Sequence, residues 1–293
     1  MIDSFIKYLT YEKRASPHTI TSYQNDLFQF HAFLKHHAPG LSVASADHQE
    51  IRAWIVDLAS KQNKARSINR KVSTLRSFYK FLHRREHIKR NPTHKVKALK
   101  AEYPLPHFVQ ENDLFKLLDT CEFTEDFSGY RDRVLLELLY GTGIRLSEMI
   151  NLRHQQVDLV RETIKVDGKG SKERIVPVHQ SLLSLATNYI AQKEAYFGEQ
   201  AAPFFLVTDK GDPCYPMMVY RTVRKYLDQY TTIEKRSPHV MRHTFATHLL
   251  DNGADLNAIK DLLGHASLAA TQVYTHNTVE KIKQAFDKAH PKA

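Results

Sequence analysis

Apolar residues recur at three- and four-residue spacing through the first hundred positions of the chain, as they do on the buried face of a helix. Ser16 and Pro17 suit the N-cap and the first helical position of the second apolar segment. Asp47 and Ser67 are placed to cap a third and a fourth. The pattern predicts a four-helix domain over residues 1–100.

The pattern changes after this domain. Residues 101–108 contain two prolines, which forbid a continuous helix and favour an extended linker. Residues 109–293 mix helical periodicity with two β-branched runs, 163–166 and 174–178, and the glycine-containing turn between them predicts a hairpin. Helices are expected near 113–121, 130–140, 146–152, 180–195, 217–230, 239–251, 256–263 and 277–289. We expect a mainly α fold with a small β-sheet: a helical N-terminal domain followed by an α+β domain.

Composition excludes several classes of protein. Hydrophobic residues make up 42% of the 293 residues, enough for packed cores, which excludes a disordered chain. The two cysteines, Cys121 and Cys214, allow one disulfide at most and no multi-cysteine zinc site. The apolar runs are too short for a transmembrane helix, and the N-terminus does not resemble a secretory signal. We expect a cytoplasmic protein with no membrane partner.

The net charge of +10 is distributed unevenly. Residues 1–100 hold 19 lysines and arginines against 7 aspartates and glutamates, whereas the remaining residues hold 23 against 25. This asymmetry indicates separate domains and a polyanionic partner for the first one. Nucleic acid is the leading candidate, because lysine and arginine displace counterions from phosphates, although a merely soluble basic surface also fits.

The basic residues of the first domain concentrate on its fourth predicted helix and at the ends of that helix. The candidate DNA contacts are Arg66, Arg70, Lys71, Arg76 and Lys80. The aromatic residues of the domain fall on the apolar stripes, so we interpret them as core rather than as base-stacking groups.

The second domain carries candidate chemistry at four places, the first of them Arg145. This arginine follows a Gly-Thr-Gly break and begins a helix, where its charge opposes the helix dipole. A capping role does not explain it, so it could bind an anion. Taken alone, a surface ion pair with Glu148 is the simpler explanation.

The second place is the tip of the predicted hairpin, which reads Gly168-Lys169-Gly170-Ser171-Lys172. A lysine between glycines lets the backbone approach a phosphate closely. The glycine spacing and the two flanking strands exclude a P-loop. An ordinary basic turn remains the alternative.

The third place is the helix that begins after Ser237-Pro238. His239, Arg242 and His243 share part of one helical face. A zinc-protease motif needs glutamate directly after the first histidine, where this chain has Val240. Arginine and histidine together suit a phosphate, because arginine offers a bidentate fork and histidine can move a proton.

The fourth place is His265, which follows a glycine at a predicted helix end, together with Tyr274. Taken together, the four places would surround a phosphate with two arginines, two histidines, a lysine and a tyrosine. No carboxylate pair accompanies them, so the pattern indicates neutralisation by side-chain cations rather than two-metal catalysis. We expect no metal and no cofactor.

In order and spacing, five motifs resemble the tyrosine recombinase (phage integrase) family, and most closely its Xer-type site-specific recombinases. They are SPHTITSYQNDLFQFHAFL, GTGIRLSE, GKGSKER, HVMRHTFATHLL and LLGHASLAATQVYTH. The resemblance covers nearly the whole chain. It implies a DNA-clamping N-terminal domain and a catalytic domain that cleaves and rejoins DNA without ATP.

The resemblance also implies a role for each motif residue. Tyr274 would attack a phosphodiester to form a 3′-phosphotyrosyl bond, and a catalytic group would protonate the leaving 5′-oxygen. The implied catalytic residues are Arg145 and Arg242 as the phosphate clamp, His265 as a further donor, His239 in proton transfer and Lys169 as the acid, with Glu148 and Lys172 in support. Tyrosine has an ordinary pKa near 10, so such a nucleophile needs neighbouring cations and a base.

The family further implies an assembly on double-stranded DNA. It would be a homotetramer, or a heterotetramer with a paralogous recombinase, joined through the C-terminal helix and resolving chromosome dimers, with a cell-division DNA translocase as a further partner. Packing of that helix on its own domain is the alternative. A type IB topoisomerase, a mobile-element integrase and a non-catalytic DNA-binding protein are the competing functions. The last would explain the charge but not six matched catalytic positions.

Overall fold

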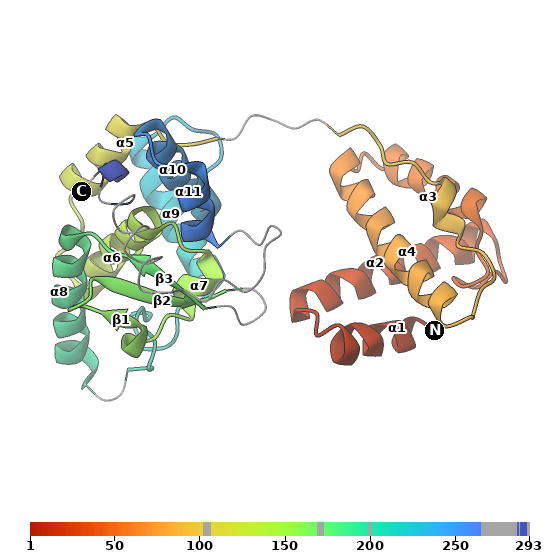
Figure 1. Ribbon diagram of the computed structural model, residues 1–293, viewed down its shortest axis with the longest axis horizontal. Helices are drawn as coiled ribbons and strands as arrows, with labels where there is room; N and C mark the ends of the chain where they lie inside the picture. The colour runs from red at the N-terminus through yellow and green to blue at the C-terminus, as the bar shows by residue number, and fades with distance from the viewer. Residues whose placement is uncertain (102–106, 169–172, 199–200, 265–285, 287, 292–293) are drawn as a thin grey trace. The chain divides into compact units, whose positions relative to one another are not determined.

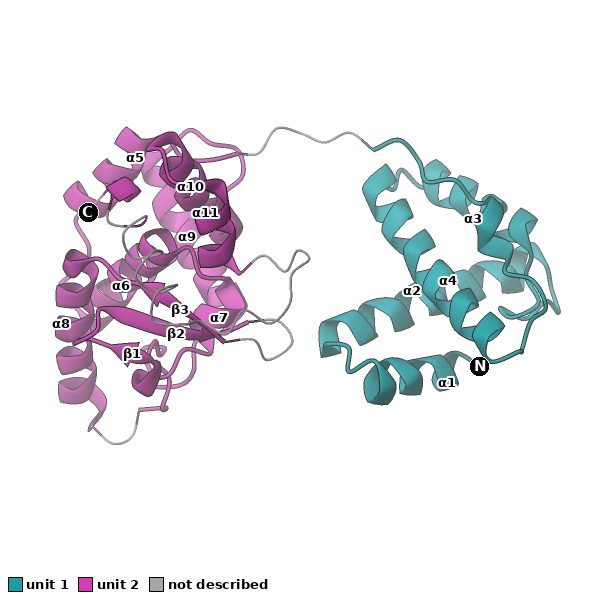
Figure 2. Cartoon of the chain, viewed as in Figure 1, with its two compact units in different colours: residues 1–104 teal, residues 105–293 magenta. Residues whose placement is uncertain are grey.

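The computed structural model describes all residues except 102–106, 169–172, 199–200, 265–285, 287 and 292–293. The chain forms two compact units, Met1–Pro104 and Leu105–Ala293 (Figure 2). The described secondary structure is mainly helical with one small sheet, which confirms the expected fold class. No described helix has the length and apolar character that crossing a membrane requires.

The described part of the first unit contains four α-helices and a 3-10 turn, Pro92–Lys95 (Figure 1). The α-helices are α1 (Ile2–Lys7, continued by a π-helical turn, Tyr8–Glu12), α2 (Pro17–His37), α3 (His48–Ser60) and α4 (Ala65–Arg84). The Ser16 hydroxyl accepts a hydrogen bond from the backbone N–H of Thr19, and the Asp47 carboxylate accepts one from the backbone N–H of Gln49. Both predicted N-caps are therefore confirmed.

The predicted cap of the fourth helix is wrong. α4 begins at Ala65 with Lys64 as its N-cap residue, so Ser67 lies inside the first turn. Gln62, with a left-handed φ of 56°, lies in the short turn after α3, and α4 begins three residues later. Lys64 makes no side-chain capping hydrogen bond.

The first unit contains a buried polar cluster between α2 and α4. Asp26 is 1% exposed and accepts hydrogen bonds from Arg70, Lys71 and Thr74. A buried carboxylate needs such partners, because burial removes the water that would otherwise stabilise its charge. The cluster fixes the rotation of α4 against α2, and with it the direction in which the basic residues of α4 point.

The second unit has the helices α5 to α11. Their bounds are α5 Glu111–Phe115 (continued by a π-helical turn, Lys116–Thr120), α6 Phe127–Thr142, α7 Leu146–Ile150, α8 Gln180–Phe197, α9 Pro216–Tyr230, α10 Pro238–Asp251 and α11 Leu256–Leu263. α6 is buried along most of its length and packs against α8 and α10, so it is the centre of this core (Figure 1). The helix predicted at 277–289 lies largely outside the described residues.

The sheet of the second unit has three antiparallel strands in the order β1 (Val157–Asp158), β2 (Thr163–Asp167) and β3 (Glu173–Pro177). The predicted hairpin strands are confirmed as β2 and β3. β1 was not predicted, because a strand of two residues is too short to show alternating apolar and polar positions. Arg174 lies opposite Val166 in the register, on the buried face of the hairpin. Cys121 and Cys214 are both free thiols.

Candidate active site

Arg145 is positioned by the end of the central helix. α6 stops at Gly143, whose φ of 59° is left-handed, and Arg145 then becomes the N-cap residue of α7. Its backbone N–H and its Nη1 donate to the two carboxylate oxygens of Glu148, each at 2.7 Å, and its Nη2 donates to the carbonyl of Gly264 at 2.8 Å. The ion pair expected between Arg145 and Glu148 is therefore confirmed. The Arg145 side chain remains 31% exposed.

Glu148 receives a second arginine, Arg174 from β3. Nη1 and Nη2 of Arg174 donate to the two carboxylate oxygens at 2.7 and 2.8 Å, and both side chains are 3% exposed. Burial alone would raise the pKa of Glu148, but the hydrogen bonds from Arg174 and Arg145 outweigh it and lower that pKa to about 2. Glu148 is therefore an anion at neutral pH.

Arg242, on α10, is a third guanidinium and, like that of Arg174, it is buried. It donates to the carbonyls of Gly143 and Leu263, each at 2.5 Å. Burial and the nearby charges of Arg145 and Arg174 lower its pKa to about 10, so it stays protonated at neutral pH. Among the described groups that act on this pKa, Glu148 is the carboxylate, and it raises the pKa.

These side chains form what we call the arginine cluster: Arg145, Glu148, Arg174 and Arg242. It gathers three cations around one anion in a largely buried place, which leaves a net positive charge. An anion with several oxygens, such as a phosphodiester, would relieve the repulsion that lowers the pKa of Arg242. The structure thus brings together three of the predicted residues, Arg145, Glu148 and Arg242.

The end of α11 is the place at which the cluster converges. Arg174, Arg242 and Arg145 donate to three consecutive carbonyls, those of Leu262, Leu263 and Gly264 respectively. The last carbonyls of a helix have no partner within the helix and carry the negative end of its dipole, so they attract cations. Gly264 closes α11 in the left-handed conformation, as predicted for the residue before His265.

The remaining predicted catalytic residues divide into two groups. His239 is described: it is exposed on α10, three positions before Arg242. Lys169, Lys172, His265 and Tyr274 lie outside the described residues.

His248, further along α10, has a structural role. One of its ring nitrogens bonds to the Tyr140 hydroxyl and the other to the carbonyl of Val109, each at 3.0 Å, and its side chain is buried.

Arg174 is the residue of the cluster that sequence reasoning missed. It lies two residues after Lys172, in a short basic stretch in which the two lysines of the hairpin tip already account for a phosphate contact. A signal was present, since Arg174 occupies an inward position of an alternating strand, in phase with Val176. A charged residue in that phase needs a buried partner.

The candidate DNA contacts of the first unit differ in exposure. Arg66 and Lys80 are exposed, whereas Arg76 is partly buried and donates to the carbonyl of Val96 at 2.7 Å. Arg70 keeps half of its side chain exposed while it forms a bidentate pair with Asp26. Lys71 is buried behind the same carboxylate, so the structure places it inside the unit rather than on the surface where a DNA contact was predicted.

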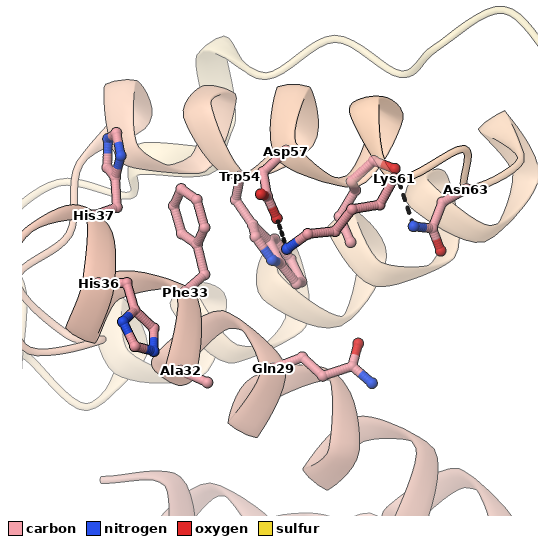
Figure 3. Close-up of a pocket in the computed structure, with 10 residues that line it drawn as sticks. Gln29, Ala32, Phe33, His36, His37, Trp54, Asp57, Lys61 and Asn63 are labelled. Atoms are coloured by element: carbon pink, nitrogen blue, oxygen red, sulfur yellow. Dashed lines mark hydrogen bonds and ion pairs between the residues drawn. The ribbon is translucent and has the colours of Figure 1, made fainter.

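The first unit also has an open groove of about 680 Å³ between α2 and α3 (Figure 3). It is lined by aromatic residues such as Phe33 and Trp54 and by the Asp57–Lys61 ion pair. None of the candidate DNA contacts lines it. Over the described part of both units, no group of three or more His, Cys, Asp or Glu residues could hold a metal ion.

Known proteins match this chain along most of its length. The phage integrase family matches residues 107–281, and its N-terminal SAM-like domain matches residues 2–86. "Tyrosine recombinase XerC" of Oceanobacillus iheyensis is 39% identical, with coverage of 100% of this chain and 96% of that protein. The protein of the same name from Staphylococcus saprophyticus is 37% identical, with coverage of 99% and 97%.

Solved structures share the fold. XerH site-specific recombinase bound to palindromic difH substrate superposes with a TM-score of 0.71 at 21% identity, over 97% of this chain and 84% of that one. A lambda integrase dimer bound to a core site gives 0.68 at 17% identity, over 93% and 97%. The chain belongs to the phage integrase family of tyrosine recombinases. It is an enzyme of the Xer type that breaks and rejoins DNA at specific sites.

Proposed function

We propose that Arg145 and Arg242 of the arginine cluster bind the scissile phosphate and that Tyr274 cleaves it. The observation that supports this proposal is the excess of cations around Glu148. Arg145 is partly exposed, and its guanidinium has more N–H donors than its two side-chain hydrogen bonds use. Those donors can bind the non-bridging oxygens, whose charge increases in the transition state.

In this mechanism the Tyr274 oxygen attacks phosphorus and the bond from phosphorus to the 5′-oxygen breaks. The leaving oxygen takes a proton from Lys169, and His239 accepts the tyrosine proton. His265 donates a further hydrogen bond to the phosphate, and Lys172 supports the leaving-group side. The phosphate stays esterified throughout, so the reverse reaction with another 5′-hydroxyl rejoins the strand without ATP. The chemistry requires no metal ion.

Domain roles follow from the charge distribution. We assign residues 1–100 to a DNA clamp, 101–108 to a linker and 109–293 to catalysis. Arg66, Arg70, Arg76 and Lys80 are the clamp contacts we retain. Lys71 is withdrawn from the set because its charge is buried against Asp26.

The cellular role we propose is resolution of chromosome dimers in the cytoplasm, by a tetramer on two duplexes. The relatives named XerC support this role. The tetramer would contain this chain alone or with a paralogous recombinase, and a cell-division DNA translocase would activate it. The C-terminal segment would join protomers. Its described residue Phe286 packs on its own unit, 6.4 Å from the ring of Phe245, so exchange would have to move this contact.

A nicked suicide substrate tests the catalytic assignment, because the cleaved strand loses a short fragment and cannot be rejoined. We expect a covalent protein–DNA complex with wild-type protein in the presence of EDTA and none with Tyr274→Phe. A complex that survives Tyr274→Phe, or that forms only with Mg²⁺, would overturn the assignment. Lys169→Ala should slow cleavage and recover on a 5′-thio substrate, whose leaving group needs no acid. Absence of recovery would exclude Lys169 as the acid.

A further inference from the structure

The Arg174–Glu148 pair costs free energy to bury, and stability alone does not explain it. Two charged side chains that are each 3% exposed have lost nearly all their water. Apolar side chains of the same volume usually serve a core at least as well as a buried ion pair. Such pairs instead restrict the positions of the two side chains, because the hydrogen bonds between them require a particular geometry.

Each oxygen of Glu148 accepts one hydrogen bond from Arg174 and one from Arg145. Oε1 accepts from Nη1 of both arginines at 2.7 Å, and Oε2 accepts from Nη2 of Arg174 at 2.8 Å and from the backbone N–H of Arg145 at 2.7 Å. The carboxylate is the link between the two arginines. Any rotation of Glu148 would move the Arg145 guanidinium, and Arg174 prevents that rotation with a two-pronged contact.

Arg174 also fixes the other anchor of Arg145. Its Nε donates to the carbonyl of Leu262 at 2.9 Å, and Arg145 donates to the carbonyl of Gly264. A Cβ atom on Gly264 would approach Cδ of Arg174 to 3.1 Å, so backbone and side chain already pack closely. Arg174 therefore bonds directly to Glu148, one acceptor of Arg145, and packs against Gly264, whose carbonyl is the other.

We propose that Arg174 is a positioning residue for DNA cleavage: it fixes Glu148 and the C-terminal end of α11, and through them the place at which Arg145 meets the scissile phosphate. The proposal rests on the proposed role of Arg145. Arg174 is not expected to touch DNA, because its side chain is 3% exposed. Its removal should slow the chemical step while DNA affinity stays the same.

The test is single-turnover cleavage of the suicide substrate by the full chain at saturating protein concentration. Arg174→Met should cleave about 10- to 100-fold more slowly, the size of effect expected when a catalytic group is misplaced by about an ångström. The protein concentration that half-saturates binding should change less than about threefold. Arg161→Met is the matched control, since Arg161 is 83% exposed on the turn between β1 and β2.

A pH profile separates positioning from a loss of folded protein. Arg174→Lys keeps the charge but loses the two-pronged contact, so the pKa of Glu148 should rise toward its ordinary value. Cleavage by this variant should then fall relative to wild type as pH decreases from about 6 to about 4, through the ordinary pKa of 4.5, as protonated Glu148 releases Arg145. Adding Glu148→Gln should remove that pH dependence and leave little further effect of changing Arg174.

Two results would overturn the proposal. One is cleavage by Arg174→Met within about threefold of wild type, and the other is a profile for Arg174→Lys that parallels the wild-type profile. Tyr274→Phe is run alongside. If it abolishes the covalent complex while the Arg174 variants cleave normally, the positioning role fails and the proposed catalytic function stands. If Tyr274→Phe still forms the complex, the catalytic assignment itself has failed.

Discussion

Gly143 lies directly against the ring of Phe245: a Cβ atom on this glycine would be 2.3 Å from Cδ1 of the phenylalanine. The contact joins the end of α6 to the middle of α10. It also places the Gly143 carbonyl where Arg242 donates to it. One residue thus combines a left-handed backbone, a close packing contact and a hydrogen bond to a candidate catalytic group.

Gly143→Ala should therefore lower the free energy of unfolding of the second unit by about 2–4 kcal/mol, the sum of a left-handed alanine and an overpacked core. Gly253→Ala is the matched control, because Gly253 has φ +84° with nothing within 4 Å of a built Cβ. It should cost about 1 kcal/mol. Urea denaturation of both variants measures the difference, and equal losses would show that Phe245 moves aside.

Glu148 should make stability depend on acid pH. Its pKa is lowered in the folded state, so its stabilisation is fully present above its ordinary value of 4.5 and is lost as pH falls toward about 2. The shift corresponds to about 3 kcal/mol. Glu148→Gln should reduce the loss of unfolding free energy between about pH 4.5 and pH 2, measured by urea denaturation at each pH. Parallel curves for variant and wild type would contradict the prediction.

Lys193 should make stability rise with pH as well, but in the alkaline range. This buried lysine, 4% exposed, donates to His154 at 2.8 Å and to the carbonyls of Ala202 and Phe204, and burial lowers its pKa to about 8. The unfolded chain then binds more protons than the folded one between about pH 8 and pH 10.5, so stability rises with pH there. Between about pH 8 and pH 9, wild type should gain about 1 kcal/mol relative to Lys193→Met. No relative gain would mean that the lysine keeps an ordinary pKa.

Substitution of Lys71 should affect stability alone, whereas substitution of Lys80 should affect DNA binding alone. Lys71→Met removes a buried partner of Asp26 and should cost about 2 kcal/mol of unfolding free energy. It should leave the salt dependence of DNA affinity unchanged. Lys80→Ala should leave stability unchanged and reduce the slope of log affinity against log salt by about 1, since an exposed lysine on phosphate releases about one counterion. A reduced slope for Lys71→Met would restore it to the DNA contacts.

Local spacing was sufficient to predict much of the fold and part of the site. Ser16 and Asp47 identified their helix starts, and Arg145 and Arg242 stood out because each follows a strong local break. The prediction that Ser67 caps α4 was wrong, because α4 begins at Ala65, shortly after the left-handed residue Gln62. The spacing of apolar side chains does not reveal such a left-handed backbone position.

Long-range pairing accounts for what the sequence did not reveal. Lys71 lies in phase with Ile68 and Leu75 on the apolar stripe of α4, but its partner Asp26 is 45 positions away. Arg174 likewise lies in the buried phase of β3, 26 positions from Glu148. In both cases the sequence pattern places the residue on a buried face. The identity of its partner depends on how separate elements pack.

The meeting of α7, β3 and α10 at the end of α11 has a consequence for hybrid enzymes. A chimera with a crossover inside the second unit would combine guanidinium groups from one parent with carbonyls from another, and small differences in helix length would separate them. Functional breakpoints should instead fall near residue 104, where the two compact units divide. Shuffled libraries that exchange Leu105–Ala293 as one block would retain the arrangement on which cleavage depends.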